Sequence, residues 1–228
     1  MKQHELIPSA SSLMESMREI GYSTESSVAD IVDNSITAKA NKVDIRYSWN
    51  NHDPWLAVID DGCGMDMDSL IEAMKMGSAN PTVERDADDL GRFGLGMKTA
   101  SLSQSRRFTV LSKENNQYSI AQWDLDSFQA GSNDRWLMNI FDMDEIEKTL
   151  KELDDKYLKL KKNGTIVFWD NIDRIDIGEN PRNQESKFNE VMMGVRSHLE
   201  LVFHRYLSPS VGKRKISISF NEDKLEAF

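Results

Sequence analysis

Apolar residues recur along this chain at two different spacings. Spacings of three or four residues predict helices, and short or alternating apolar runs predict strands. The helices expected from this pattern cover residues 11–19, 26–40 and 68–76, with a further helix that starts at residue 97. The expected strands cover residues 42–47, 55–60, 107–112 and 117–123. Because helices and strands are grouped and do not alternate strictly, we expect an α+β fold, a layered α/β sandwich with a mixed, largely antiparallel sheet.

Two longer amphipathic stretches follow in the last third of the chain. The charged segment 142–162 carries apolar side chains at helical spacing, at Ile146, Leu150, Leu153, Tyr157 and Leu160. Such a stripe could pair with a partner helix, but fewer than three heptads favour packing on its own domain. A second stripe covers residues 188–202, and residues 215–220 alternate like a strand that enters a hairpin.

The expected helix 26–40 carries the first candidate site. Its apolar residues recur every four positions, at Val28, Val32 and Ile36. Asp30 and Asn34 therefore share another face, one turn apart. A carboxamide oxygen is a hard neutral ligand for Mg²⁺, and a carboxylate can accept a proton from an attacking water. The pair suits a nucleoside triphosphate, and the alternative is a solvated helix face that also includes Asp33.

The second candidate site follows the expected strand 55–60, which is ended by Asp-Asp-Gly-Cys-Gly. Asp60 lies at the strand end, where its carboxylate can accept a hydrogen bond from an exocyclic amine such as that of adenine. Gly62 and Gly64 would let a ligand ring approach the backbone. An Asp-Gly turn without a ligand explains the same residues, so both interpretations remain open here.

The third candidate site is a glycine-rich segment, Gly91-Arg-Phe-Gly94-Leu-Gly96, directly before an expected helix start. Free N–H groups at a helix start favour phosphate, and Lys98 adds a mobile positive charge. The segment is not a P-loop, because Met97 separates the last glycine from the lysine. It also differs from the dinucleotide-binding fingerprint, whose glycines have the opposite spacing. A flexible glycine loop is the alternative.

In this order the three motifs resemble those of the GHKL ATPases, which include gyrase B-type topoisomerases, a heat-shock chaperone, sensor histidine kinases and the MutL mismatch-repair proteins. A fourth stretch, 163–169, is similar to the Gly-Thr strand of that family, whose threonine supports the adenine-binding aspartate. The resemblance covers residues 20–169 and is nearest to the MORC-like and chaperone-like branch. It implies the Bergerat-type two-layer α/β sandwich, with a lid at about residues 77–97 and a helical insert at about 142–162.

The resemblance also implies a role for individual residues. Asp30 and Lys98 are expected to be catalytic, Asn34 to be the metal ligand, and Met65 to lie beside the base. The expected cofactors are ATP and Mg²⁺. The expected nucleotide contacts come from all four motifs: Asn34, Asp60, Gly62, Gly64, Met65, Gly91, Arg92, Phe93, Gly94, Leu95, Gly96, Met97, Lys98, Thr99 and Thr165.

Two residues depart from the family pattern. Asp30 stands where a glutamate is expected and is one methylene shorter, and Thr37 stands where many members carry aspartate. We therefore expect ATP binding with slow hydrolysis, in which lid closure is coupled to dimerisation or to a conformational change in a partner. A nucleotide sensor that does not hydrolyse ATP is the first alternative. A histidine kinase ATP-binding domain is a weaker one, because no helix with a phosphoacceptor histidine precedes the motifs.

Composition limits the class of protein further. The 228 residues are 39% hydrophobic and 29% charged, which fits a single domain. We expect it to be truncated before a following transducer domain, because the last hairpin stops abruptly. The net charge of −10 argues against direct nucleic-acid contact. One cysteine, Cys63, and the absence of a long apolar run indicate a cytoplasmic protein without a membrane segment.

Overall fold

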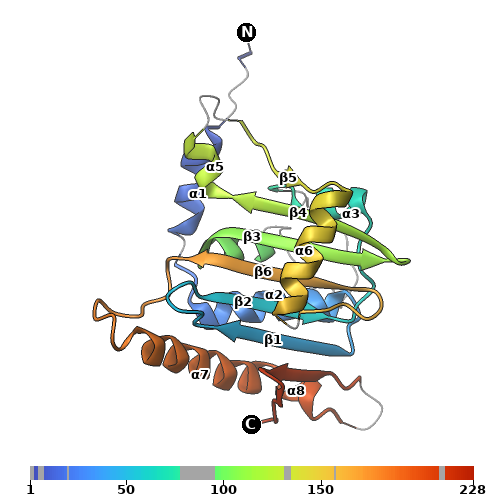
Figure 1. The fold of residues 1–228 in the computed structure, drawn as a ribbon. Helices are drawn as coiled ribbons and strands as arrows, with labels where there is room; N and C mark the ends of the chain where they lie inside the picture. Colours follow the sequence, from blue (N-terminus) through green and yellow to red (C-terminus); the bar gives the residue numbers. More distant parts are fainter. Residues whose placement is uncertain are drawn as a thin grey trace.

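The computed structural model describes residues 3–4, 8–19, 21–77, 96–130, 135–156, 158–210 and 214–228. Their strands are β1 (Lys42–Ser48), β2 (Trp55–Asp60), β3 (Ser105–Glu114), β4 (Gln117–Asp124), β5 (Asn139–Ile140), β6 (Gly164–Ile172), β7 (Ser217–Phe220) and β8 (Asp223–Lys224). These strands form one sheet in the order β5-β4-β3-β6-β2-β1-β7-β8 (Figure 1). Within it, β1 and β7 are parallel and the other neighbours are antiparallel. The expected mixed, largely antiparallel sheet is confirmed.

The helices are distributed unequally over the two faces of this sheet. They are α1 (Ala10–Arg18), α2 (Thr24–Thr37), α3 (Met67–Met74), α4 (Gly96–Leu102), α5 (Leu125–Ala130), α6 (Met143–Asp155), α7 (Gln184–Val202) and α8 (His204–Leu207). In Figure 1, α6 crosses the near face of the sheet and α2 lies behind it. The larger apolar core lies on the α2 side, and a second, smaller one lies under α6. The α+β sandwich is confirmed, and α6 adds a cover on the second face.

Side-chain caps explain where several helices begin. Ser23 Oγ accepts a hydrogen bond from the Ser26 N–H at 3.2 Å, which starts α2 two residues before the expected position. At α6, Asp142 and Glu145 form a reciprocal capping box, with N–H···O distances of 3.0 and 2.9 Å. These caps satisfy N–H groups that have no partner within the helix.

Four expected helices end earlier in the structure. The helix expected over 11–19 ends at Arg18, and the helix expected over 26–40 ends at Thr37. The helix expected over 68–76 ends at Met74, because Lys75 is already extended. Its last carbonyls are bonded by distant side chains: Lys98 Nζ donates to the Ala73 oxygen at 2.7 Å, and Trp123 Nε1 donates to the Met74 oxygen at 3.0 Å. Tertiary partners therefore replace a further helical turn.

The segment expected to be helical over 142–162 is helical as α6 and ends at Asp155. Ile146 and Leu153 of its predicted stripe are buried in the second core, so the prediction that it packs on its own domain is confirmed. Leu158 and Leu160 enter the same core from the non-helical segment that follows the helix. The apolar spacing thus marks a buried side correctly but does not mark the end of the helix.

None of the helices in the described ranges is long and apolar enough to cross a membrane.

Candidate functional site

Helix α2 carries the first motif on the face that the apolar spacing predicted. Val28 and Val32 are fully buried in the larger core, whereas Asp30 is half-buried and Asn34 is exposed. Asn34 Nδ2 donates a hydrogen bond to the Asp30 carbonyl one turn earlier, at 2.9 Å. Because a carbonyl can only accept, this bond fixes the amide orientation and leaves Asn34 Oδ1 available as a ligand for a hard cation.

The start of α4 lies against Asp30. A Cβ built at Gly96 would stand 3.7 Å from Asp30 Oδ2. Burial raises the pKa of Asp30 above its usual value, and the side chain of Tyr22 lowers it in part. The first and third motifs, far apart in the sequence, therefore meet at this carboxylate. A carboxylate that has a raised pKa and is still ionised at neutral pH accepts a proton more readily than a carboxylate with an ordinary pKa.

Asp33 lies on the same helix one turn after Asp30. Burial, together with the charge of Asp30, raises the pKa of Asp33 from 3.8 to about 6. The folded protein therefore holds a proton on Asp33 at pH values where the unfolded chain has released it. It follows that this carboxyl group destabilises the fold as the pH rises from about 4 through about 6.

We expect Asp33→Asn to stabilise the protein at neutral pH, by on the order of 1 kcal/mol after allowance for solvent screening. The gain should shrink toward zero as the pH falls to about 4 and below, where the Asp33 carboxyl group of the wild type becomes protonated in the unfolded chain as well as in the folded protein. Urea unfolding at pH 4 and at pH 7.5 measures both values. A difference between variants that is equal at the two pH values would contradict the shifted pKa.

The second motif is built around the buried carboxylate of Asp60, which is 8% exposed at the end of β2. Its Oδ2 accepts a hydrogen bond from Ser35 Oγ at 3.0 Å. Its Oδ1 accepts from the Gly62 N–H at 2.9 Å and from the Thr165 N–H at 3.2 Å. Burial raises the pKa of Asp60, and these three bonds oppose that effect. A carboxylate offers about four acceptor positions, so one remains for a ligand donor such as an exocyclic amine.

Thr165 supports Asp60 through its backbone and not through its hydroxyl group. Strand pairing places Thr165 opposite Asp60 on one side and opposite Ser112 on the other. Its Oγ1 lies 3.0 Å from Ser112 Oγ, which also accepts the Met65 N–H at 2.8 Å. Ser112 therefore links Thr165 to the backbone of Met65, the residue expected beside the base.

Sequence reasoning missed Ser35 and Ser112. Ser35 directly follows Asn34 on α2, and this position next to a motif residue was the available signal. Ser112 had no local signal, because it reaches the site only through the pairing of β3 with β6.

The glycines of this motif are packed against the protein's own backbone. A Cβ at Gly64, whose φ is +77°, would stand 2.0 Å from the Lys113 oxygen. A Cβ at Gly62 would stand 2.8 Å from the Ala38 oxygen and 2.9 Å from Asp60 Oδ1. Their small size is therefore required by these close approaches. The expected role in shaping a purine pocket stays a prediction.

Only part of the glycine-rich motif falls in the described residues. Gly91, Arg92, Phe93, Gly94, Leu95 and most of the expected lid lie outside them. Met97 is half-buried against the core, and Thr99 Oγ1 donates to the Gly96 oxygen at 3.2 Å.

Lys98 is buried, whereas the sequence suggested a mobile positive charge. It is 2% exposed, and its ammonium group contacts the Ala73 carbonyl at the end of α3. Burial lowers the pKa of Lys98 to about 8, and Glu72 opposes this shift. To contact a phosphate, the side chain would have to leave Ala73. The catalytic role of Lys98 stays a prediction.

The donor set of the site suits Mg²⁺ held together with a phosphate ligand. The described residues contain no group of three or more His, Cys, Asp or Glu side chains that could hold a metal ion alone. Mg²⁺ commonly takes one or two protein oxygens and completes its shell with phosphates and water. Asn34 Oδ1 fits that pattern.

The buried strand-end carboxylate of Asp60 thus lies next to a helix that carries a carboxylate–carboxamide pair, Asp30 and Asn34. The family model described as histidine kinase-, DNA gyrase B-, and HSP90-like ATPase matches residues 22–158, which is more than half of the chain. The chain belongs to this family, so the predicted resemblance to GHKL ATPases is confirmed, and membership supports ATP binding.

One curated relative is the ATPase MORC2B of Mus musculus. It is 32% identical to this chain over 94 residues, which cover 39% of this chain and 9% of MORC2B. The chain thus spans less than a tenth of the length of this relative.

Proposed function

We propose that this domain binds Mg·ATP and hydrolyses it slowly. Asp60 accepts a hydrogen bond from the adenine amine, Asn34 supplies an oxygen ligand to Mg²⁺, and Asp30 is the general base. The observation that carries the proposal is the environment of Asp60. Three donors from α2, the loop after β2 and β6 hold the buried carboxylate, and one acceptor position is left over.

Residues of this chain are proposed to select the base and to accept the proton of the attacking water. Ser35, Gly62 and Thr165 hold the Asp60 carboxylate in one orientation, so that it selects a base with an amine at its edge. Bound Mg²⁺ supplies positive charge that stabilises the phosphates. Asp30 accepts the proton of the attacking water, and its raised pKa favours this transfer.

The remaining parts of the proposal rest on family membership. Closure of the segment 77–97 over the nucleotide would be coupled to homodimerisation or to a conformational change in a downstream domain or protein partner. Lys98 would take part only after its contact with Ala73 is released. A cytoplasmic location is also expected, and the net charge of −10 argues against direct nucleic-acid contact.

A nucleotide sensor without useful hydrolysis is the second candidate. It is favoured by one observation, the short Asp30 side chain at the position of the family glutamate. No described feature favours the histidine kinase alternative.

The test of ATP binding uses Asp60→Asn. We expect Mg·ATP to raise the melting temperature of the wild type, since a ligand of the folded state stabilises it by mass action. Asp60→Asn should weaken ATP affinity by at least about tenfold, because an amide replaces the acceptor. Thermal-shift titration and calorimetry measure both effects.

Asp68→Asn is the matched control, because this exposed aspartate lies on α3. It should bind ATP as the wild type does. Unchanged ATP affinity in a folded Asp60→Asn variant would remove the adenine assignment, and absence of any ATP binding in the wild type would remove the proposed function.

A further inference from the structure

Tyr22 lies directly before Ser23, the N-cap residue of α2. Its side chain is half-buried and forms a hydrogen bond with the side chain of Asp30, about two turns further along the helix. An ionised carboxylate can only accept, so the Tyr22 hydroxyl group donates to it. The proposed general base is therefore bonded by a neutral donor from outside its own helix.

The same hydroxyl group reaches α4. Tyr22 and Thr99 form a hydrogen bond through their side chains. Thr99 Oγ1 also lies 3.2 Å from the Gly96 carbonyl oxygen, and a Cβ built at Gly96 would stand 3.7 Å from Asp30 Oδ2. The Tyr22 hydroxyl group thus lies where the first turn of α4 meets the carboxylate on α2.

A buried glutamine holds the backbone of Tyr22. Gln104 lies between α4 and β3 and is 2% exposed. Its Nε2 donates to the Tyr22 carbonyl oxygen at 3.1 Å and also lies 3.1 Å from Ser27 Oγ. Its Oε1 accepts a hydrogen bond from Thr24 Oγ1, in the first turn of α2, at 2.8 Å. Gln104 therefore fixes the residue that carries the phenol against the start of α2.

The Asp30 carboxylate must face the attacking water during the reaction, because proton transfer requires an approach within hydrogen-bonding distance. An aspartate side chain on a helix can adopt more than one staggered rotamer. A hydrogen bond from a donor on a separate, fixed segment favours one of these rotamers. It occupies one acceptor position of the carboxylate and leaves others for the water.

We propose that Tyr22 is a positioning residue, whose hydroxyl group holds the Asp30 carboxylate in the orientation that accepts the proton of the attacking water. This inference rests on the proposed function, in which Asp30 is the general base. It adds a residue that lies outside the four sequence motifs and that joins the base to α4.

Removal of the Tyr22 hydroxyl group has two effects of opposite sign on the reaction. Burial raises the pKa of Asp30, and the hydrogen bond from Tyr22 opposes this rise. Without the hydroxyl group, Asp30 would be a stronger base that is less well oriented. A role in positioning predicts a slower reaction, whereas an effect on basicity alone predicts a faster one.

The experiment compares the wild type, Tyr22→Phe, Asp30→Ala and the double variant, each in the full chain. We expect Tyr22→Phe to lower the single-turnover rate of ATP hydrolysis about tenfold, the usual effect of one hydrogen bond to a charged group. The Kd for ATP should change less than about twofold, because orientation of the base matters only in the transition state. In the double variant, Tyr22→Phe should cause no further loss of rate, since no carboxylate remains to be oriented.

The same four proteins also report the contact without ATP. Urea unfolding of the set gives a double-mutant cycle for the free energy of unfolding. We expect the two substitutions to be non-additive by about a factor of ten in the unfolding equilibrium constant. Side chains that do not touch would be additive to within about a factor of two.

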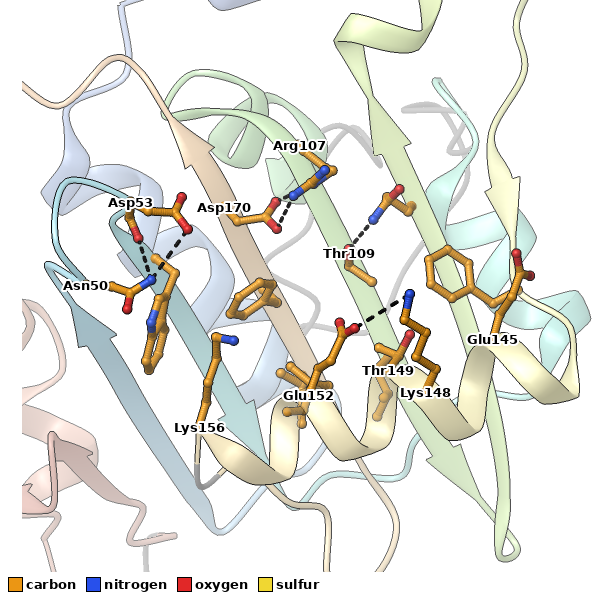
Figure 2. A pocket seen from close by; sticks show the side chains of 17 residues that line it. Asn50, Asp53, Arg107, Thr109, Glu145, Lys148, Thr149, Glu152, Lys156 and Asp170 are labelled. Carbon is orange, nitrogen blue, oxygen red and sulfur yellow. Dashed lines mark hydrogen bonds and ion pairs between the residues drawn. The ribbon is translucent and has the colours of Figure 1, made fainter.

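Tyr118→Phe is the matched control, because this half-buried tyrosine packs against the second core, under α6. Figure 2 shows that face of the sheet, where α6 and the strands enclose a cavity of about 350 Å³ on the side opposite α2. The control should leave the rate of hydrolysis and the Kd for ATP within about a factor of two of the wild type.

Four outcomes would overturn the proposal. An unchanged or faster rate in Tyr22→Phe would exclude a role in positioning. A parallel loss of ATP affinity and rate would indicate a role in binding. An equal loss of rate from Tyr22→Phe with and without Asp30, or additive effects on unfolding, would show that Tyr22 does not act through this carboxylate. A wild-type rate at background is a different result, because it would remove the proposed hydrolysis itself and the role of Tyr22 with it.

Discussion

Replacement of Asp30 by alanine should lower the rate of ATP hydrolysis by about 10²- to 10⁴-fold and leave ATP affinity nearly unchanged. A general base acts on the water in the transition state and contributes little to ground-state binding. Asp30 is half-buried, lies beside Gly96 at the start of α4, and has a raised pKa. Phosphate release under single-turnover conditions and equilibrium binding of ATP measure the two quantities.

The companion variant Asp30→Glu separates the ATPase from the nucleotide sensor. If the short carboxylate limits the reaction, the longer side chain should accelerate hydrolysis. A background rate in both wild type and Asp30→Glu, measured in a protein that includes any following domain, would favour the sensor. A wild-type rate above background that Asp30→Ala leaves untouched would rule out Asp30 as the base.

Asn34→Ala should remove magnesium-dependent ATP binding and lower kcat/KM by at least about a hundredfold, because the only proposed protein ligand of the ion is lost. In the structure, Asn34 is exposed and its amide nitrogen bonds to the Asp30 carbonyl. Its loss should therefore cost little folding stability. Calorimetric titration with ATP, with and without Mg²⁺, measures the magnesium-dependent part of the affinity.

Two variants control this result. Asn34→Asp keeps an oxygen at the same position and should retain part of the magnesium dependence. Asn41→Ala removes an exposed carboxamide just after α2 and should bind Mg·ATP as the wild type does. If Asn34→Ala shows the same magnesium dependence as the wild type, Asn34 is not the ligand.

The sequence by itself determined which sides of the elements are buried. The four-residue spacing of Val28, Val32 and Ile36 orients α2, and β2 was predicted with its observed bounds, so that Asp60 stands at a strand end. These features follow from local periodicity and from the turn residues that stop the strand. The four motifs then identified the family, which the family model confirms.

The ends of several elements depended on distant partners and could not be predicted locally. The last turn of α3 ends at Met74, where Lys98 and Trp123 bond its carbonyls. Helix α6 ends at Asp155, although the apolar spacing continues to Leu160, and Leu158 and Leu160 are buried in the second core from a segment that is not helical. The apolar spacing predicts which side chains are buried, but it does not predict whether the backbone that carries them is helical.

The tertiary structure alone decided how the site is assembled. Pairing of β2 with β6 brings the Thr165 N–H to Asp60, and pairing of β3 with β6 places Ser112 where it accepts the Met65 N–H. The packing of α2 on the sheet brings Ser35 to the Asp60 carboxylate. The crossing of α6 over the sheet leaves a cavity that is lined in part by Trp55. These contacts join residues far apart in the chain, and they depend on strand register and helix placement, which only packing of the whole fold determines.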